Sequence, residues 1–217
     1  MKQPSICLKG HEVRAILSGG KTQHRVSIKL PHQNPLGVWE PGTIGGGTAV
    51  YADGTPAAER PCIWHTRTGD TLACPYGLVG DRLWVRETWQ TWCDFDETSP
   101  RDLPTNMQIQ YPATYDGWTS KRRPSVHMPR WASRIALEIV SVRVERLQDI
   151  SEADAIAEGC TKNHNGYFWG GPHKVSGLKQ MATAINAYRD LRESINGPDS
   201  WNLNPWVWIV EFRRITE

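Results

Sequence analysis

SRIALEIVSVRVERLQDI, residues 133–150, is the stretch of this sequence that decides the fold. It contains two successive sets of alternating apolar residues, Ile135, Leu137 and Ile139, followed by Val140, Val142 and Val144. Alternation predicts a β-strand with one buried face, and a change of parity within a strand requires an extra residue. We therefore predict one long strand that is bent by a β-bulge, as in a strand that turns the corner of a barrel.

The segments around this strand predict further strands and helices. Ser151 and Asp154 fit a capping box that begins a helix, and Gly159 ends it. Other helices are predicted over residues 11–18 and 178–197. Further strands are predicted over residues 4–8, 82–86, 107–116 and 204–215. The last of these strands is apolar on both faces at its start, which predicts a central place in a sheet.

Together these elements predict an α+β protein built as a small, bent β-barrel with flanking helices. We expect a single domain over residues 1–217, with a loop-rich insertion at about residues 31–75. Proline and glycine are dense in that insertion, and apolar periodicity is absent. Because a long segment without regular structure is uncommon in a compact domain, we expect the insertion to be mobile or functional.

Composition and charge limit the possible partners only loosely. The 217 residues carry a net charge of +2 and include 11 tryptophans, so a nucleic-acid partner is neither required nor excluded. No apolar stretch is long enough to span a membrane, and the N-terminus does not resemble a signal peptide. We therefore expect a cytoplasmic protein without a membrane partner. The cysteines, five in number, are expected to be free thiols.

GGKTQHR, residues 19–25, follows the first predicted helix and holds a candidate site. A lysine beyond a helix C-terminus, such as Lys21, is favourable on electrostatic grounds alone. Glu158 differs, since it lies in the last turn of a predicted helix, where the helix dipole disfavours an anion. A carboxylate placed against the local field is a weak indication of function, and a solvated surface residue is the ordinary alternative.

Five segments of the chain resemble one known family. GGKTQHR resembles the Gly-x-Lys signature loop of the ASCH superfamily, a branch of the PUA-like domains. Four more segments, in the same order as in a phage-associated ASCH family, are CPYGLVGDRLWVRETW, RPSVHMPRWASRI, ERLQDISEADAIAEG and NPWVWIVEF. The resemblance covers most of the chain outside about residues 31–72.

The resemblance implies a PUA-like barrel whose cleft meets RNA, nucleotides or modified nucleosides. Small ASCH proteins include N4-acetylcytidine amidohydrolases, which use a lysine, a threonine and a glutamate, and others described as ribonucleases. By position the lysine is Lys21 and the glutamate is Glu158, while the threonine falls at His24. An arginine that is common at the end of the loop is Val26 here, although Arg25 remains.

The residue types in this candidate site fit hydrolysis. Lys21, His24 and Arg25 supply hydrogen-bond donors, and Glu158 could pair with Lys21 and orient it. His24 could act as a general base on a water molecule, because the ordinary pKa of histidine lies near neutrality. Thr22 could instead supply the hydroxyl of the family's nucleophile.

Other residues are candidates for contact with a nucleoside or a nucleic acid. Glu87 and Trp89 follow the strand at residues 82–86 and could line the same cleft. The candidates for base stacking are Tyr76, Trp84 and Trp131, and those for contact with a phosphate backbone are Lys121, Arg122, Arg123 and Arg130. The ordinary alternatives are core packing for the aromatic residues and a solvated loop for the basic ones.

Two sets of cysteines and histidines have spacings that zinc tolerates, namely Cys62, His65 and Cys74, and Cys160, His164 and His173. Neither set is a complete four-ligand pattern in the sequence, so we expect no metal and no cofactor.

We therefore predict a metal-independent hydrolase that acts through Lys21, His24 and Glu158 on an N4-acylcytidine or an RNA phosphodiester. The alternative is a non-catalytic module of phage origin that binds RNA or modified nucleic acid. It would use Arg25, exposed tryptophans and the basic residues at 121–130. A third possibility is a protein–protein role in phage development.

Overall fold

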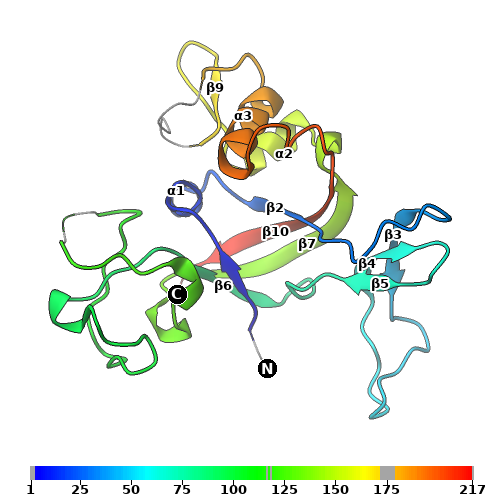
Figure 1. Cartoon of the computed structure of the whole chain (residues 1–217), viewed down its shortest axis with the longest axis horizontal. Coiled ribbons are helices and arrows are strands. Elements are labelled where there is room, and N and C mark those ends of the chain that lie inside the picture. Colours follow the sequence, from blue (N-terminus) through cyan, green and yellow to red (C-terminus); the bar gives the residue numbers. More distant parts are fainter. Residues whose placement is uncertain (1–2, 116, 118, 172–178, 217) are drawn as a thin grey trace.

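A five-stranded sheet forms the centre of the protein (Figure 1). The computed structural model describes residues 3–115, 117, 119–171 and 179–216. In spatial order the strands are β1 (Ser5–Cys7), β6 (Arg82–Arg86), β7 (Ala136–Arg146), β10 (Trp206–Ile215) and β2 (Gln23–Ser27). Neighbouring strands are antiparallel except β1 and β6, which are parallel. The strands predicted over residues 4–8, 82–86 and 204–215 are thus confirmed.

The long strand β7 carries the predicted bulge. Its register with β10 shifts between Glu211, which faces Ser141, and Phe212, which faces Ile139. Val140 is therefore the extra residue, and its relative exposure is 49%. The parity of the apolar residues changes at the same position in the sequence, so the prediction of a bent strand is confirmed.

Strand β10 is buried on both faces, as its sequence predicts. On one face Val207 and Ile209 pack with residues of α2 (Glu152–Ala157) and α3 (Ala184–Asn196). The other face belongs to the main core, which it shares with α1 (Gly10–Leu17), and it presents Trp208, Val210 and Phe212. The sheet is therefore one layer between the helices and the main core, and β10 holds the two together.

The helix signals of the sequence are confirmed for α2 and corrected for α3. Ser151 Oγ accepts a hydrogen bond from the Asp154 backbone at 3.1 Å, and Gly159 follows the helix with φ 104°. Helix α3 begins later than predicted, because Thr183 Oγ1 accepts from the Asn186 backbone at 3.2 Å and caps the helix there. Residue 178, the predicted start, lies outside the described residues.

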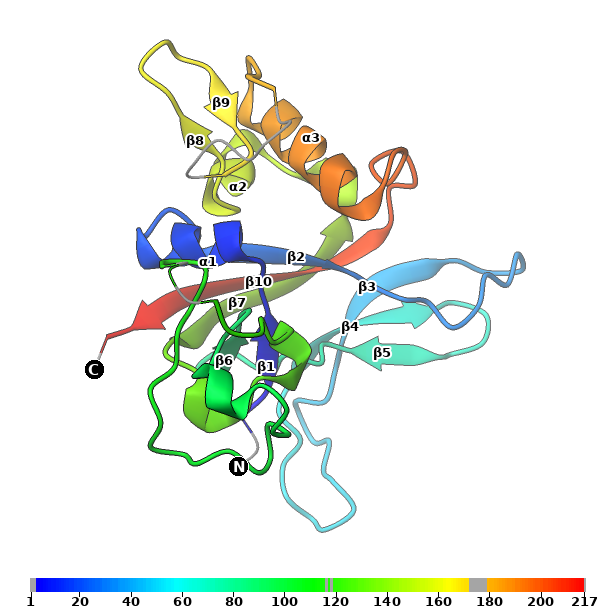
Figure 2. The ribbon, with the colours of Figure 1, turned by 60° about the vertical axis from the view of Figure 1, so that its left-hand side comes forward.

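The insertion predicted at residues 31–75 consists largely of loops and also holds a second sheet, which the sequence analysis did not predict. Its three antiparallel strands are β3 (Trp39–Ile44), β4 (Arg60–His65) and β5 (Thr71–Ala73). The sequence of β3, WEPGTI, contains a proline and a glycine, so it lacks the alternation that marks a strand. Figure 2 shows this sheet beside the main sheet, and Trp39 and Ile63 are buried in the main core.

The strand predicted over residues 107–116 is wrong. Gln110 forms only an isolated bridge with Gln90, and Asp116 lies outside the described residues. The segment between β6 and β7 instead contains three short 3-10 helices, η1 (Cys93–Phe95), η2 (Ser125–His127) and η3 (Arg130–Ala132). The remaining described elements are η4 (Leu147–Asp149), β8 (Thr161–Lys162) and β9 (Phe168–Trp169).

The fold class is α+β, as predicted, but no closed barrel is found in the described part of the chain. Strands β1 and β2 are the two edges of the five-stranded sheet and do not pair with each other there. Helix α1 connects these two edge strands and adds Val13 and Ile16 to the main core. No helix within the described ranges is both long enough and apolar enough to cross a membrane.

Candidate functional site

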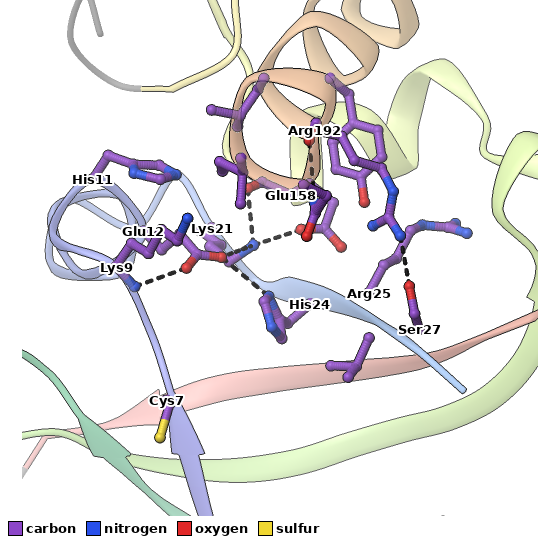
Figure 3. Close-up of a pocket in the computed structure, with 15 residues that line it drawn as sticks. Cys7, Lys9, His11, Glu12, Lys21, His24, Arg25, Ser27, Glu158 and Arg192 are labelled. Carbon is purple, nitrogen blue, oxygen red and sulfur yellow. Dashed lines mark hydrogen bonds and ion pairs between the residues drawn. The ribbon is translucent and has the colours of Figure 1, made fainter. Parts of the chain in front are cut away.

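A pocket of about 350 Å³ lies between α1, β2, the end of α2 and α3 (Figure 3). Its walls include the three residues that the sequence predicts as catalytic, Lys21, His24 and Glu158. They arrive from separate elements, because Lys21 follows α1, His24 lies on β2 and Glu158 ends α2. The resemblance to the family therefore selected residues that the fold brings together.

Lys21 is held by Glu158 in a buried ion pair. Its Nζ lies 2.5 Å from Glu158 Oε2 and donates to the Glu158 backbone carbonyl at 3.0 Å. That carbonyl belongs to the C-cap of α2, where the negative end of the helix dipole favours a cation. An ammonium group has three donors, and the nearest further acceptor, Glu12 Oε1, lies 3.7 Å away, beyond hydrogen-bond distance. Lys21 therefore keeps one donor for a ligand.

Glu12, on α1, places a second carboxylate in the pocket. Its Oε2 accepts from the Lys9 backbone at 2.8 Å, and its Oε1 lies 3.2 Å from His24 Nδ1. Burial raises the pKa of Glu12, but the charge and hydrogen bond of His24 and the charge of Lys21 outweigh it. The pKa of Glu12 therefore lies well below its ordinary value, and the group is an anion that orients His24.

Several buried polar atoms of this pocket have no hydrogen-bond partner in the protein. They include Glu158 Oε1 and His11 Nε2. His24 Nδ1 lies 3.2 Å from Glu12 Oε1, and that carboxylate is its partner in the pocket. Burial lowers the pKa of His11, which keeps its ring neutral near pH 7. Buried polar groups are normally satisfied, so these atoms are spare capacity for a ligand.

Arg25 and Thr22 do not add to the hydrogen-bonding capacity that the pocket leaves for a ligand. The Arg25 side chain is fully buried and lies 3.3 Å from Glu145 and 3.1 Å from Asp154, so its charge is already paired. Thr22 is exposed and lines a shallower pocket with Asp154. The structure therefore does not bring the Thr22 hydroxyl to Lys21 and Glu158.

Arg25 belongs to a network of charges shared by β2, β7, β10 and α2. The Arg25–Arg143 network, as we name it, consists of Arg25, Arg143, Glu145, Asp154 and Glu211. Arg143 lies 2.7 Å from Glu145 and 2.8 Å from Asp154, and it also contacts Glu211. Burial lowers the pKa of Arg143, but hydrogen bonds to these carboxylates outweigh that effect and raise it.

The aromatic residues predicted to stack on bases lie away from the pocket. Trp84 is 6% exposed and donates through Nε1 to the Gln3 carbonyl at 3.1 Å. Tyr76 packs against the main core, and Trp131 meets Trp89 edge to face with ring centroids 6.4 Å apart. Core packing, the ordinary alternative, therefore accounts for their placement.

The basic residues at 121–130 do not form one open patch. Arg123 is buried and donates to the carbonyls of Thr98 and Phe95. Lys121 Nζ lies 3.4 Å from Glu97, and the Arg130 guanidinium lies over Trp84 at 5.8 Å. Burial of Arg123 therefore removes one cation from the surface that a nucleic-acid backbone would contact, while Lys121, Arg122 and Arg130 stay exposed.

Glu87, which was predicted to line the cleft, is instead a buried structural partner. It is 1% exposed, and both of its oxygens accept from Arg134 at 2.9 Å. Such a two-pronged contact satisfies the carboxylate fully.

The zinc-like spacings do not converge in the described ranges. No group of three histidine, cysteine or acidic side chains there is placed to hold a metal ion, and His173 lies outside these ranges. All five cysteines are free, as predicted.

Glu12 and Arg192 are among the pocket residues that the sequence analysis did not identify. Glu12 had only its place in the first turn of a helix as a signal, and that position is common for an acidic residue. Arg192 lies in the helix predicted over residues 178–197 and was given no role. Comparison with protein-family models, with curated proteins and with solved structures found no match to this chain.

Proposed function

We propose that this protein is a hydrolase of an N4-acylated cytidine and that the reaction takes place in the pocket at Lys21. The observation that carries the proposal is the buried Lys21–Glu158 pair beside the Glu12–His24 pair, with polar atoms left unused. Assignment to the ASCH superfamily is part of this proposal, and it rests on the sequence resemblance.

In this proposal His24 is the general base. Its Nδ1 faces Glu12, so the other ring nitrogen, Nε2, remains to accept a proton from water. Glu12 is an anion that stabilises the imidazolium formed when that proton arrives. The water oxygen then attacks the acyl carbon of the amide.

Lys21 and Glu158 have separate roles. The free donor of Lys21 stabilises the oxyanion that forms on the acyl oxygen. Glu158 Oε1, which lacks a partner in the protein, accepts a hydrogen bond from the N4 amide of the cytosine. His24 returns its proton to N4 as the carbon–nitrogen bond breaks, and the products are a carboxylic acid and the cytosine amine.

The dimensions of the site favour a nucleoside over an RNA strand. A pocket of about 350 Å³ has the size of a small-molecule site. A strand would also require a run of available cations, and Arg25 and Arg123 are occupied inside the protein. We therefore prefer the nucleoside hydrolase to the nucleic-acid binding module.

The test is product formation from a panel of N4-acylcytidines, followed by liquid chromatography. Lys21→Met should abolish turnover, and Lys121→Met, which removes an exposed lysine elsewhere, should leave it unchanged. Thermal unfolding of both variants shows whether they are folded. Turnover by folded Lys21→Met, or none by the unaltered protein on any member of the panel, would refute the proposal.

A further inference from the structure

One wall of the pocket carries a cation without an ion-pair partner. Arg192 lies on α3 and is 9% exposed. Its Nη2 donates to Ser27 Oγ at 2.6 Å, while its Nε is buried and has no hydrogen-bond partner. Within the described ranges no carboxylate lies at ion-pair distance from its guanidinium group. Arg192 is therefore a buried positive charge whose polar neighbours, Ser27 and Tyr188, carry no negative charge to pair with it.

This arrangement is unlike that of Arg25, which lines the same pocket and contacts the carboxylates of Glu145 and Asp154. Beside Arg192, the face of α3 that lines the pocket presents the apolar residues Leu191 and Ile195. Burial of an unpaired charge on an apolar helix face is unfavourable unless a binding partner offsets it.

The position of Arg192 suits a ligand that also reaches His24. Figure 3 shows Arg192 and Ser27 at one side of the pocket and Glu12, Lys21 and His24 at the other. Ser27 follows His24 by three residues on β2, so the two positions are about 10 Å apart along the strand. The two ends of one extended small molecule could therefore occupy both places.

We infer that Arg192 and Ser27 form an anion subsite for the phosphate of a nucleotide. A guanidinium group presents paired donors that match phosphate oxygens, and the buried Nε supplies one that is unused. The inference rests on the proposed function and narrows its substrate class, from an acylated cytidine to an acylated cytidine monophosphate.

Binding can be measured without turnover by using molecules that carry no acyl group. Isothermal titration calorimetry with cytidine, cytidine 5′-monophosphate and inorganic phosphate would compare the unaltered protein with Arg192→Gln. The matched control is Arg189→Gln, which removes an arginine of the same helix that is 45% exposed and lies 3.4 Å from Glu193. Thermal unfolding of both variants establishes that they are folded.

The unaltered protein and Arg189→Gln should bind the monophosphate about tenfold more tightly than cytidine. For Arg192→Gln, the dissociation constants of the monophosphate and of cytidine should differ by no more than about twofold. If the unaltered protein binds the monophosphate and cytidine equally, the anion subsite is refuted. The hydrolase proposal is then unaffected, because the turnover assay tests it separately. Binding of phosphate alone, lost in Arg192→Gln, keeps the subsite and refutes the nucleoside. Binding of none of the three ligands overturns the subsite.

Discussion

Two clusters of paired charges share strand β2, and they differ in what they leave unused. In the Arg25–Arg143 network, no described side-chain nitrogen or oxygen is buried without a partner. The Lys21 cluster, by which we mean Glu12, Lys21, His24 and Glu158, leaves Glu158 Oε1 without one. Both clusters join elements that are distant in the sequence.

The difference separates a structural cluster from a binding one. In a saturated network, the ion pairs and hydrogen bonds offset the free-energy cost of removing the charges from water, and they specify how the strands and α2 pack. The Lys21 cluster contains a more deeply buried ion pair but leaves hydrogen-bonding capacity that a ligand can use. Spare capacity, more than burial or charge, therefore distinguishes the candidate site.

Lys21→Met should have the largest effect on stability. It leaves the buried carboxylate of Glu158, whose side chain is 4% exposed, without its cation. We expect a loss of about 3–5 kcal/mol in the free energy of unfolding, measured by urea denaturation. The double variant Lys21→Met/Glu158→Leu should recover much of that loss. A single variant as stable as the unaltered protein would show that the pair is not effectively buried.

Arg25→Met should have a smaller effect on stability and none on the site. The side chains of its partners Glu145 and Asp154 are 28% and 19% exposed, so water can partly solvate them after the change. We expect a loss of about 2–3 kcal/mol, with turnover per folded molecule within twofold of the unaltered protein. If turnover falls by more than the loss of folded protein explains, the Arg25–Arg143 network contributes to the activity of the Lys21 cluster, contrary to this prediction.

Glu12→Gln should change the response to acid. The folded pKa of Glu12 lies below the ordinary value of 4.5, so its ionised form stabilises the fold above that pH. This stabilisation is lost as the pH falls below 4.5 toward the folded pKa. The variant should be less stable by about 1–2 kcal/mol at pH 7, and the gap should narrow in melts between pH 5 and pH 3. If the difference in stability between the unaltered protein and Glu12→Gln does not change with pH, the ionised form of Glu12 does not stabilise the fold as predicted.

Thr22→Ala should have the smallest effect. Thr22 is exposed, and its backbone contacts to Ala157 and Phe212 do not involve the side chain. Stability should stay within about 0.5 kcal/mol, and turnover of N4-acylcytidines should be unchanged. A large loss of turnover would instead support the hydroxyl of Thr22 as nucleophile and displace His24 from that step.

The sequence predicted the features that local rules govern. The bulge at Val140 follows from side-chain parity, and the start of α2 follows from its capping box. The meeting of Lys21, His24 and Glu158 was predicted by the family resemblance, since no local rule relates residues so far apart. Their catalytic roles remain a proposal.

Other features could not be predicted because they depend on tertiary contacts. The second sheet contains a strand with proline and glycine, which is stabilised by pairing and by burial of Trp39. Arg192 interrupts an apolar helix face, and only the structure shows that this face lines a pocket. Glu12 fits a routine helix start, so its turn toward His24 has no signature in the sequence.

The contact between Lys21 and Glu158 spans 137 residues, which affects how the protein can be made. Strand β2 pairs only with β10 among the described strands, so it has no partner on the ribosome until residues 206–215 emerge. Until then an edge strand and the charges beside it remain in water, and the pocket does not exist. Strand β10 must therefore be synthesised before β2 can pair and the pocket can take its final form.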